Sequence, residues 1–496
     1  MKNNLLATTA LAVIVFTTSA MAKQISVSTG EEIVISNKVE INNSDTSAIV
    51  NKGTLLLENG ADFYSNKNDK DKQNGGAILN SGTIIIKNGV NFDSNEVTGH
   101  GGAIFNNGKI TIDGKATFKN NKTIQGSELK DPYYRGGAIL NRTDSTFSEI
   151  IFNGETEFSD NTSANSGGAI DNISGKITFN KKAIFMNNQA KGYGGAIYNY
   201  GNDKYDSEII FNDGVEFSNS KMPDEGYSSS FIHNATETSK VFIKGDALFQ
   251  NAYINAGSAV LNQGLFQYED ENGVISFLDN TAPYASALSN GGNGEVIIKA
   301  KKVIFDNNDT MSLDKAYAGA IWNTNKMEIL GEENIFTNNK SQSTGNNQTE
   351  DKIVQIGGGA IQYRASGTGS YLIIGTENSV NNFANNEAVQ NGGAILARGE
   401  GDDNATTTIS GTTTFSGNKA GGSGGAIYNK SIIGDNGVAG KSYITIAGNS
   451  TFSNNYAGKE GGAVYNSENT SLNLSGEATF SENKAGEKYN DIHNLG

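Results

Sequence analysis

Hydrophobic and polar residues alternate with a period of two in short segments along the chain. Between residues 101 and 121, the segment KITI places Ile110 and Ile112 on one face, and KATF does the same with Ala116 and Phe118. This period is typical of β-strands that bury one face, and no long segment keeps the 3.6-residue period of a helix. Asn-Gly and Asp-Gly turns separate the segments. The pattern predicts an all-β protein built of short strands.

A pentad of the form GAIxN repeats at a spacing typical of solenoid proteins. Its units lie about 32 residues apart on average, within the range of known repeat architectures. Each unit contains three strand-length segments, which describes one coil of a parallel β-helix. We therefore expect a parallel β-helix of about 15 coils with three short strands per coil. The pentads end at Asn51, Asn80, Asn106, Asn141, Asn172, Asn199, Asn234, Asn262, Asn290, Asn323, Tyr363, Ala397, Asn429, Asn466 and Asn494.

Two columns of side chains are expected inside the coils. The pentad Ile or Val and the Asn two places later share one face, so asparagines of successive coils should hydrogen-bond along the stack. The preceding glycines allow a positive φ and avoid a Cβ clash. Phenylalanines should form the second column. They are Phe63, Phe92, Phe118, Phe158, Phe185, Phe217, Phe249, Phe277, Phe305, Phe336, Phe383, Phe415, Phe452 and Phe480.

The N-terminus has the features of an export signal. An apolar run over residues 5–16 precedes Ala-Met-Ala at 20–22, which predicts a signal peptide over residues 1–22. We expect residues 23–45 to cap the N-terminal edge and residues 46–496 to form the repeat domain. The apolar run is about half of the ~20 residues that span a bilayer, so no transmembrane segment is predicted.

Composition excludes several classes of function. The formal net charge is -15, which argues against binding to nucleic acid or to anionic lipid, since both need clustered Lys and Arg. The chain has no cysteine, so it has no disulfide, no thiolate metal site and no acylated cysteine. No cofactor is expected.

The motifs GGA[ILV] and FxxN alternate through nearly the whole chain after residue 22. Together they resemble the repeats of chlamydial polymorphic outer-membrane proteins and related autotransporter passengers. The resemblance implies a right-handed β-helix that is displayed on, or released from, a Gram-negative-type cell surface, commonly for adhesion. Members of that family end in a membrane β-barrel and are often rich in cysteine. This sequence ends at YNDIHNLG, so we expect no such barrel within it.

The variable pentad position should face outward and carries several aromatic residues. An exposed aromatic side chain can stack on a sugar ring or anchor a protein partner. The alternative is that aromatic residues fill a pleated surface because of their β-propensity. The binding candidates at this position are Tyr198, Trp322, Tyr428 and Tyr465.

The repeat is most irregular between residues 340 and 411. Tyr363 and Ala397 replace the pentad asparagine, and acidic residues follow on the second of these coils. Functional sites are expected where a regular array is broken. One interpretation is an enzyme site, because polysaccharide lyases and hydrolases with a β-helix use Arg and Asp from neighbouring coils. The other interpretation is that two solvated loops interrupt the ladder and carry no site. The binding candidates are Arg364, Arg398 and Glu400, and the catalytic candidates are Arg364, Arg398, Asp402 and Asp403.

Other motifs fail on spacing or context. In GDNGVAGKS, residues 434–442, the glycines are one residue too far apart for a phosphate loop and a strand follows instead of a helix. In GGSGGAIYN, residues 421–429, Ala426 stands where a calcium repeat needs Asp. Among the pentads, Asp171 is the one Asp at the variable, outward position, so it lacks a carboxylate partner for acid–base chemistry. The histidines His100, His233 and His493 lie on different coils, so surface roles are expected and no metal site.

These features indicate an exported protein of the cell surface, outer membrane or extracellular space. Its expected role is adhesion to an extracellular glycan or protein, or a structural role. The alternative is a carbohydrate-active enzyme on the same scaffold, because the fold by itself does not decide function. Unpaired backbone groups after Asn494 also predict self-association.

Overall fold

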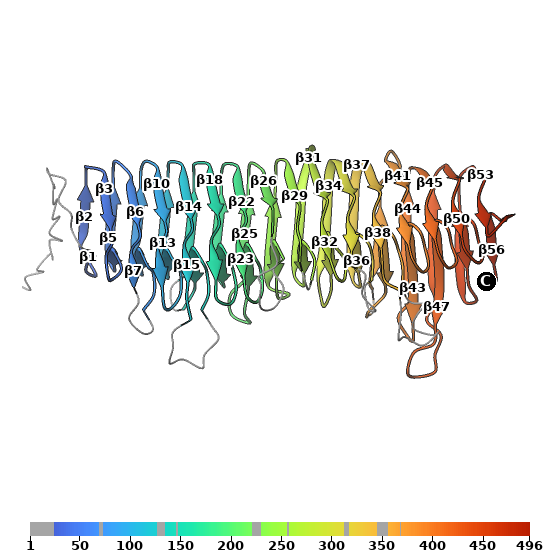
Figure 1. Ribbon diagram of the computed structural model, residues 1–496, viewed down its shortest axis with the longest axis horizontal. Helices are drawn as coiled ribbons and strands as arrows, with labels where there is room; N and C mark the ends of the chain where they lie inside the picture. Colours follow the sequence, from blue (N-terminus) through green and yellow to red (C-terminus); the bar gives the residue numbers. More distant parts are fainter. Residues whose placement is uncertain are drawn as a thin grey trace, which may run out of the picture. The chain divides into compact units, whose positions relative to one another are not determined.

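The computed structural model describes residues 24–68, 73–125, 134–144, 147–220, 230–254, 257–311, 317–344, 356–367 and 369–496. The predicted signal peptide, residues 1–22, lies outside this part. The chain divides into two compact units, Met1–Asp213 (unit 1) and Gly214–Gly496 (unit 2). Each unit is a stack of strands, and no helix occurs among the described residues (Figure 1). The predicted all-β fold is confirmed.

One coil shows how the repeat folds. It consists of β12 (Ile104–Asn106), β13 (Lys109–Ile112), β14 (Ala116–Lys119) and β15 (Lys122–Thr123). The first three strands were predicted, and the fourth is a two-residue strand that follows FxxN. Each strand pairs in parallel with its counterparts on the neighbouring coils, as β12 does with β8 (Ile78–Asn80). The protein is therefore a parallel β-helix.

We call the sheet of pentad strands the pentad sheet of each unit. In unit 1 it consists of β1 (Ile25–Val27), β4 (Ile49–Asn51), β8, β12, β16 (Ile139–Arg142), β20 (Ile170–Ile173) and β24 (Ile197–Tyr200). In unit 2 it consists of β27 (Ile232–Asn234), β30 (Val260–Asn262), β33 (Leu288–Asn290), β36 (Ile321–Asn323), β39 (Ile361–Arg364), β43 (Ile395–Glu400), β47 (Ile427–Ile432), β51 (Val464–Asn466) and β56 (Ile492–Asn494).

The segment expected to cap the N-terminal edge has the form of a coil itself. Residues 23–45 contain β1, β2 (Glu32–Ile35) and β3 (Val39–Asn42). These strands pair in parallel with β4, β5 (Thr54–Leu57) and β6 (Ala61–Tyr64). The coils therefore begin before the first recognisable pentad, because Ile33, Ile35 and Ile41 already supply the inward face.

Buried asparagines form the predicted ladder behind the pentad sheet. In unit 1 the Nδ2 of each pentad asparagine from Asn51 to Asn172 donates to the Oδ1 of the next, at 2.7 to 3.0 Å. In unit 2 the same bonds run from Asn234 to Asn323 and from Asn429 to Asn494. Between these runs Tyr363 and Ala397 occupy the position.

A second asparagine ladder, which was not predicted, runs through the FxxN corner. The Nδ2 of Asn161 donates to Asn188 Oδ1 on the next coil (2.9 Å) and to the carbonyl of Phe118 (2.9 Å). Its Oδ1 accepts from both the backbone N–H and the Nδ2 of Asn121. The preceding Asp160 has a φ of 56°, so the chain turns left-handed and aims Asn161 inward. Unit 2 repeats this ladder from Asn280 to Asn483.

Stacked phenylalanines fill the space between the ladders, as predicted. In unit 1 the rings from Phe63 to Phe185 stack with centroids 4.6 to 5.0 Å apart. In unit 2 the stack runs from Phe217 to Phe480 with centroids 4.6 to 5.4 Å apart. These separations are favourable for aromatic pairs, and the rings are buried along most of each stack.

The glycine pair before each pentad has two separate tasks. Gly101 has a φ of 68°, which a residue with a side chain adopts only under strain. Gly102 lies against the next coil, where a Cβ would come within 2.0 Å of the Gly137 carbonyl oxygen. The first glycine therefore makes the turn, and the second allows the coils to stack.

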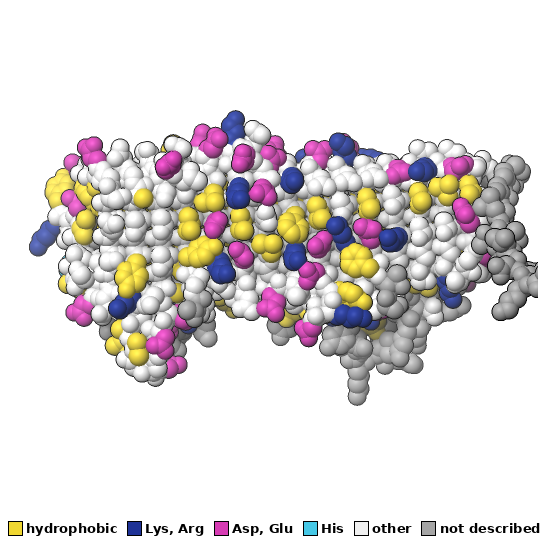
Figure 2. Space-filling model, turned by 180° about the vertical axis from the view of Figure 1, so that it is seen from behind, with side chains coloured by type: hydrophobic (Ala, Val, Ile, Leu, Met, Phe, Trp, Pro, Cys, Tyr) yellow, Lys and Arg dark blue, Asp and Glu magenta, His cyan; other side chains and the backbone are white. Residues whose placement is uncertain are grey.

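Opposite charges face each other across neighbouring coils on the outer surface (Figure 2). In unit 1, Lys176 lies 3.4 Å from Glu208, and in unit 2, Lys302 lies 3.1 Å from Glu333. These residues are register partners on adjacent strands. Exposed pairs of this kind contribute little stability each.

Replacing Asn161 by Ala should destabilise unit 1 strongly. The change removes the acceptor of the backbone N–H of Asn121 and breaks the side-chain ladder to Asn121 and Asn188, so the free energy of unfolding should fall by about 3 kcal/mol. Asn180→Ala is the control, because it removes only the solvent-exposed hydrogen bonds of Asn180 with Asn153 and Asn212 and should cost less than about 1 kcal/mol. Urea unfolding followed by circular dichroism measures both, and equal effects would contradict the importance of the ladder.

Candidate functional site

The outer face of the pentad sheet carries the predicted aromatic residues, but they are less exposed than expected. Tyr428 is only 4% exposed, and Tyr198, Trp322 and Tyr465 are half-buried. Residues that precede the glycine pair fold over this face. Tyr193 lies on Tyr198, with ring centroids 6.0 Å apart. The prediction of freely exposed rings is therefore wrong for Tyr428 and only partly met by the others.

Neighbouring aromatic side chains also pack on one another along the face. In unit 2, the rings of Tyr428 and Tyr465 stack at 5.0 Å, and His493 stacks on Tyr465 at 5.2 Å. His493 Nε2 lies 3.5 Å from a carboxylate oxygen of Glu460. Burial raises the pKa of the Tyr428 phenol. This stack packs side chains of three adjacent coils against one another.

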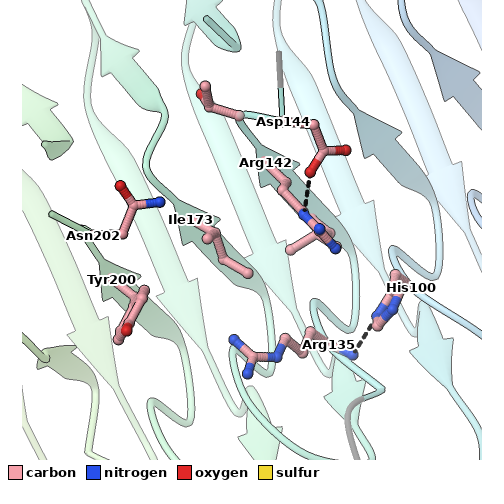
Figure 3. A pocket seen from close by; sticks show the side chains of 9 residues that line it. His100, Arg135, Arg142, Asp144, Ile173, Tyr200 and Asn202 are labelled. Atoms are coloured by element: carbon pink, nitrogen blue, oxygen red, sulfur yellow. Dashed lines mark hydrogen bonds and ion pairs between the residues drawn. The ribbon is translucent and has the colours of Figure 1, made fainter. Parts of the chain in front are cut away.

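A pocket opens on the outer face of the pentad sheet in unit 1 (Figure 3). Its volume is about 720 Å³, within the range of small-ligand sites. Arg142, Ile173 and Tyr200 are register partners on β16, β20 and β24, and they lie one residue after the pentad asparagine. Their side chains share the outward face with the variable position. The lining is completed by His100, Arg135, Leu140, Thr143, Asp144 and Asn202.

Hydrogen bonds and an ion pair fix the polar side of this pocket. Arg142 Nε lies 2.7 Å from Asp144 Oδ1, and Asn107 Nδ2 donates to Asp144 Oδ2 at 2.9 Å. The backbone N–H of Arg135 donates to His100 Nδ1 at 3.3 Å. In Figure 3 the Arg135 guanidinium extends from the His100 side of the pocket toward the Tyr200 side.

Aromatic rings complete the same region. The Arg135 guanidinium lies 5.9 Å from the ring centroid of Tyr198, within the range of a cation–π interaction. The ring of Tyr198 lies nearly parallel to that of Tyr200, with centroids 6.2 Å apart. The pocket therefore combines planar polar groups that donate and accept hydrogen bonds with flat apolar rings.

Tyr198, which the sequence predicts as a binding residue, lies beside the pocket, whereas the lining residues Arg135, Arg142 and Tyr200 were not predicted. Arg142 and Tyr200 occupy the position directly after the pentad asparagine, which is the position of the predicted Arg364 and Arg398. Charged or aromatic residues at this position on nearby coils are the sequence signal that could have indicated the pocket. Arg135 directly precedes a glycine pair, and its position in the sequence does not indicate that its side chain lines the pocket.

Asp171 lies beside this pocket and is buried, although its position was expected to face solvent. It is fully buried, and Ser166 Oγ donates to its Oδ2 at 2.5 Å. Its Oδ1 has no hydrogen-bond partner among the described residues. Burial raises its pKa to about 6, against the opposing effects of the Arg135 charge and the Ser166 hydrogen bond.

In unit 2 the structure brings Arg364, Arg398 and Glu400 together. Arg364 and Arg398 are register partners on β39 and β43, and Lys430 follows on β47. Arg364 Nε lies 3.0 Å from Glu400 Oε2, and Arg398 Nη2 lies 3.8 Å from the same oxygen. The Arg364 side chain is 41% exposed, whereas that of Arg398 is only 3% exposed.

The predicted partners Asp402 and Asp403 instead belong to a turn. Glu400 and Asp403 exchange backbone hydrogen bonds of 3.0 and 3.1 Å, which closes a hairpin. Asp402 accepts a hydrogen bond of 2.7 Å from Asn436, which lies in a second hairpin after β47. The described loops of the irregular region are thus ordered, while residues 345–355 and 368 lie outside the described part. The carboxylate beside the arginines is that of Glu400.

The remaining candidates occupy separate places. His233 was expected at the surface, but it is 7% exposed and burial lowers its pKa to about 4. His100 lines the pocket of unit 1. Residues 434–442 form the second hairpin and the start of β48 (Ser442–Ala447). Over the described ranges, no three His, Cys, Asp or Glu side chains gather in a way that could hold a metal ion.

Comparison with known proteins supports the predicted family resemblance. The family model of the Chlamydia polymorphic membrane protein repeat matches residues 155–172, 182–200, 412–430 and 449–467. Each match runs from the FxxN strand through the glycine pair to the pentad, so the chain carries this repeat in both units. No curated protein and no solved structure matches the chain. Among the described residues, no helix has the length and hydropathy to cross a bilayer. The repeats support an exported, surface-displayed protein of the autotransporter type.

The burial of Asp171 should make the stability of unit 1 depend on pH. Its folded-state pKa lies above the usual 3.8, so its contribution is fully present below about pH 4 and is lost as the pH rises through about 6. The loss should amount to about 3 kcal/mol. Asp171→Asn cannot ionise and should lack this loss. Urea midpoints of parent and variant between pH 4 and 7 measure the difference, and parallel pH profiles would contradict the assignment.

Proposed function

We propose that the chain is the passenger part of a surface-displayed protein and that it mediates adhesion by binding an extracellular glycan. The pocket on the pentad sheet of unit 1 is the observation that supports this proposal best. The matched repeats support display at the cell surface, and the pocket provides a place for a ligand on the outer face of the coils.

The chemistry of the pocket suits a sugar. A sugar ring has an apolar face of C–H groups and an edge of hydroxyl groups. Tyr200, which lies beside Tyr198, offers a flat ring for the face. The Arg142–Asp144 pair offers fixed donors and acceptors for the edge, and Asn202 adds an amide.

The scaffold favours binding because little has to become ordered. Arg142 and Tyr200 stand on strands whose asparagines belong to the pentad ladder. Asp144 is held by Asn107 and by Arg142 before any ligand arrives. A preorganised site loses less conformational entropy on binding than a flexible one.

The other roles stay open as alternatives with less support. Adhesion through a protein ligand would use the same face, and self-association remains a prediction. The enzyme alternative placed Arg364 and Arg398 with Asp402, but both arginines converge on Glu400 and Asp402 bonds to Asn436. No contact of the described residues favours catalysis there over binding.

Two substitutions should weaken glycan binding without unfolding the protein. Tyr200→Ala removes the ring, and Arg142→Gln removes the charge-assisted donors, so each should reduce affinity roughly tenfold. A glycan array with the purified chain identifies the ligand, and calorimetry with the best glycan measures the affinity. Tyr456→Ala is the matched control, because Tyr456 is an exposed aromatic residue on β50 (Tyr456–Ala457), outside the pentad sheet.

The same variants test adhesion. Beads coated with the parent protein should adhere to cells that display the glycan, and beads with Tyr200→Ala should adhere less. If no glycan on the array binds the parent protein, or if Tyr200→Ala and Tyr456→Ala bind equally well, the proposed function is wrong.

A further inference from the structure

Arg398 is a buried cation whose hydrogen-bonding capacity is largely unused. Its side chain is 3% exposed, and its Nε and Nη1 atoms have no hydrogen-bond partner in the described part of the chain. Among the described residues, its one ion pair is the contact of 3.8 Å between Nη2 and Glu400 Oε2. A buried guanidinium normally has close hydrogen-bonded partners, because burying it without them is costly.

The charges around Arg398 do not balance locally. Glu400 is shared with Arg364, which holds it at the shorter distance of 3.0 Å. Lys430 is the register partner of Arg398 on the other side and adds a third positive charge. Burial, and then the charge of Arg364, lower the pKa of Arg398 to about 10. The cluster therefore carries a net positive charge, which an additional anion would neutralise in part.

Aromatic side chains lie next to this cluster. The ring of Tyr317 stacks on Trp322 with centroids 5.3 Å apart and on Tyr284 at 5.8 Å. Tyr317 is also close enough to Arg398 for an electrostatic interaction between the two side chains. A guanidinium beside stacked rings suits a ligand with a carboxylate and an adjoining ring with an apolar face.

We propose that Arg398, together with Arg364, binds the carboxylate of an acidic sugar. The carboxylate approaches from the side on which Arg364 and Glu400 are partly exposed, and one of its oxygens accepts a hydrogen bond from the free Nη1 of Arg398. The sugar ring lies toward Tyr317 and Trp322. Glu400 remains the counter-ion of Arg364. This site lies wholly in unit 2 and is independent of the pocket proposed for unit 1.

The site differs from a purely structural ion pair in one testable respect. If Arg398 held Glu400 in place, its removal would leave a buried carboxylate without a partner and destabilise the fold. Since Arg364 already pairs with Glu400 more closely, Arg398→Gln should leave the melting temperature unchanged or raise it.

Trp322 is the single tryptophan of the chain and reports on this region directly. Sodium galacturonate, titrated at constant ionic strength, should change the Trp322 fluorescence with saturation and an affinity on the order of 1 mM. Glucose should give no response, and sodium acetate should bind more weakly than galacturonate because it lacks the ring.

Arg398→Gln should weaken galacturonate binding about tenfold or more, since a hydrogen bond to a charged group contributes about that much. Lys302→Gln removes a cation on β34 (Glu295–Asp306), outside the pentad sheet and outside both proposed sites, and should leave the response unchanged. Four results would overturn the proposal: no response of the parent to galacturonate, an unchanged affinity in Arg398→Gln, a lowered melting temperature of that variant, or tighter binding of polyglutamate than of galacturonate.

Discussion

The structure depends on buried asparagine side chains that bond to identical side chains one coil away. A buried amide must satisfy two donors and an acceptor, and in a repeating coil the same amide on the next coil can do so. Asn161 illustrates this, because it makes hydrogen bonds to both neighbouring coils and to two backbone groups. Only an in-register stack satisfies every amide. The ladders therefore favour the parallel, in-register pairing over the other strand pairings that the period-two pattern would allow.

This constraint leaves the outer face free to vary. Inward positions repeat as Ile, Asn and Phe, whereas the outward positions of the pentad sheet hold residues as different as Asp171, Tyr198 and Arg398. A binding site can therefore arise on the outer face without a change in the ladders. Both proposed sites use this freedom, and both depend on residues directly after the pentad position that closes the inward ladder.

The repeat, the strands and two of the internal columns could be predicted because they follow from period-two alternation. The corner ladder could not, because Asn161 lies three residues after Phe158 and alternation alone would aim it outward. The left-handed φ of Asp160 reverses that direction. The burial of Tyr428 and Asp171 was missed for another reason. Tyr428 is stacked on Tyr465 of the next coil, and Asp171 is hydrogen-bonded to Ser166, which precedes a glycine pair; no periodicity encodes such contacts.

The central claim is that side-chain ladders, and not only strand pairing, hold successive coils together. Amide hydrogen exchange of the unmodified protein tests it at the FxxN corners, where the backbone N–H of Asn121 donates to Asn161 Oδ1 at 3.0 Å. An ordinary surface turn opens with little cost and exchanges quickly. We predict that the Asn121 amide exchanges as slowly as the amides of β13 and β14. Exchange at the rate of an open turn would contradict it.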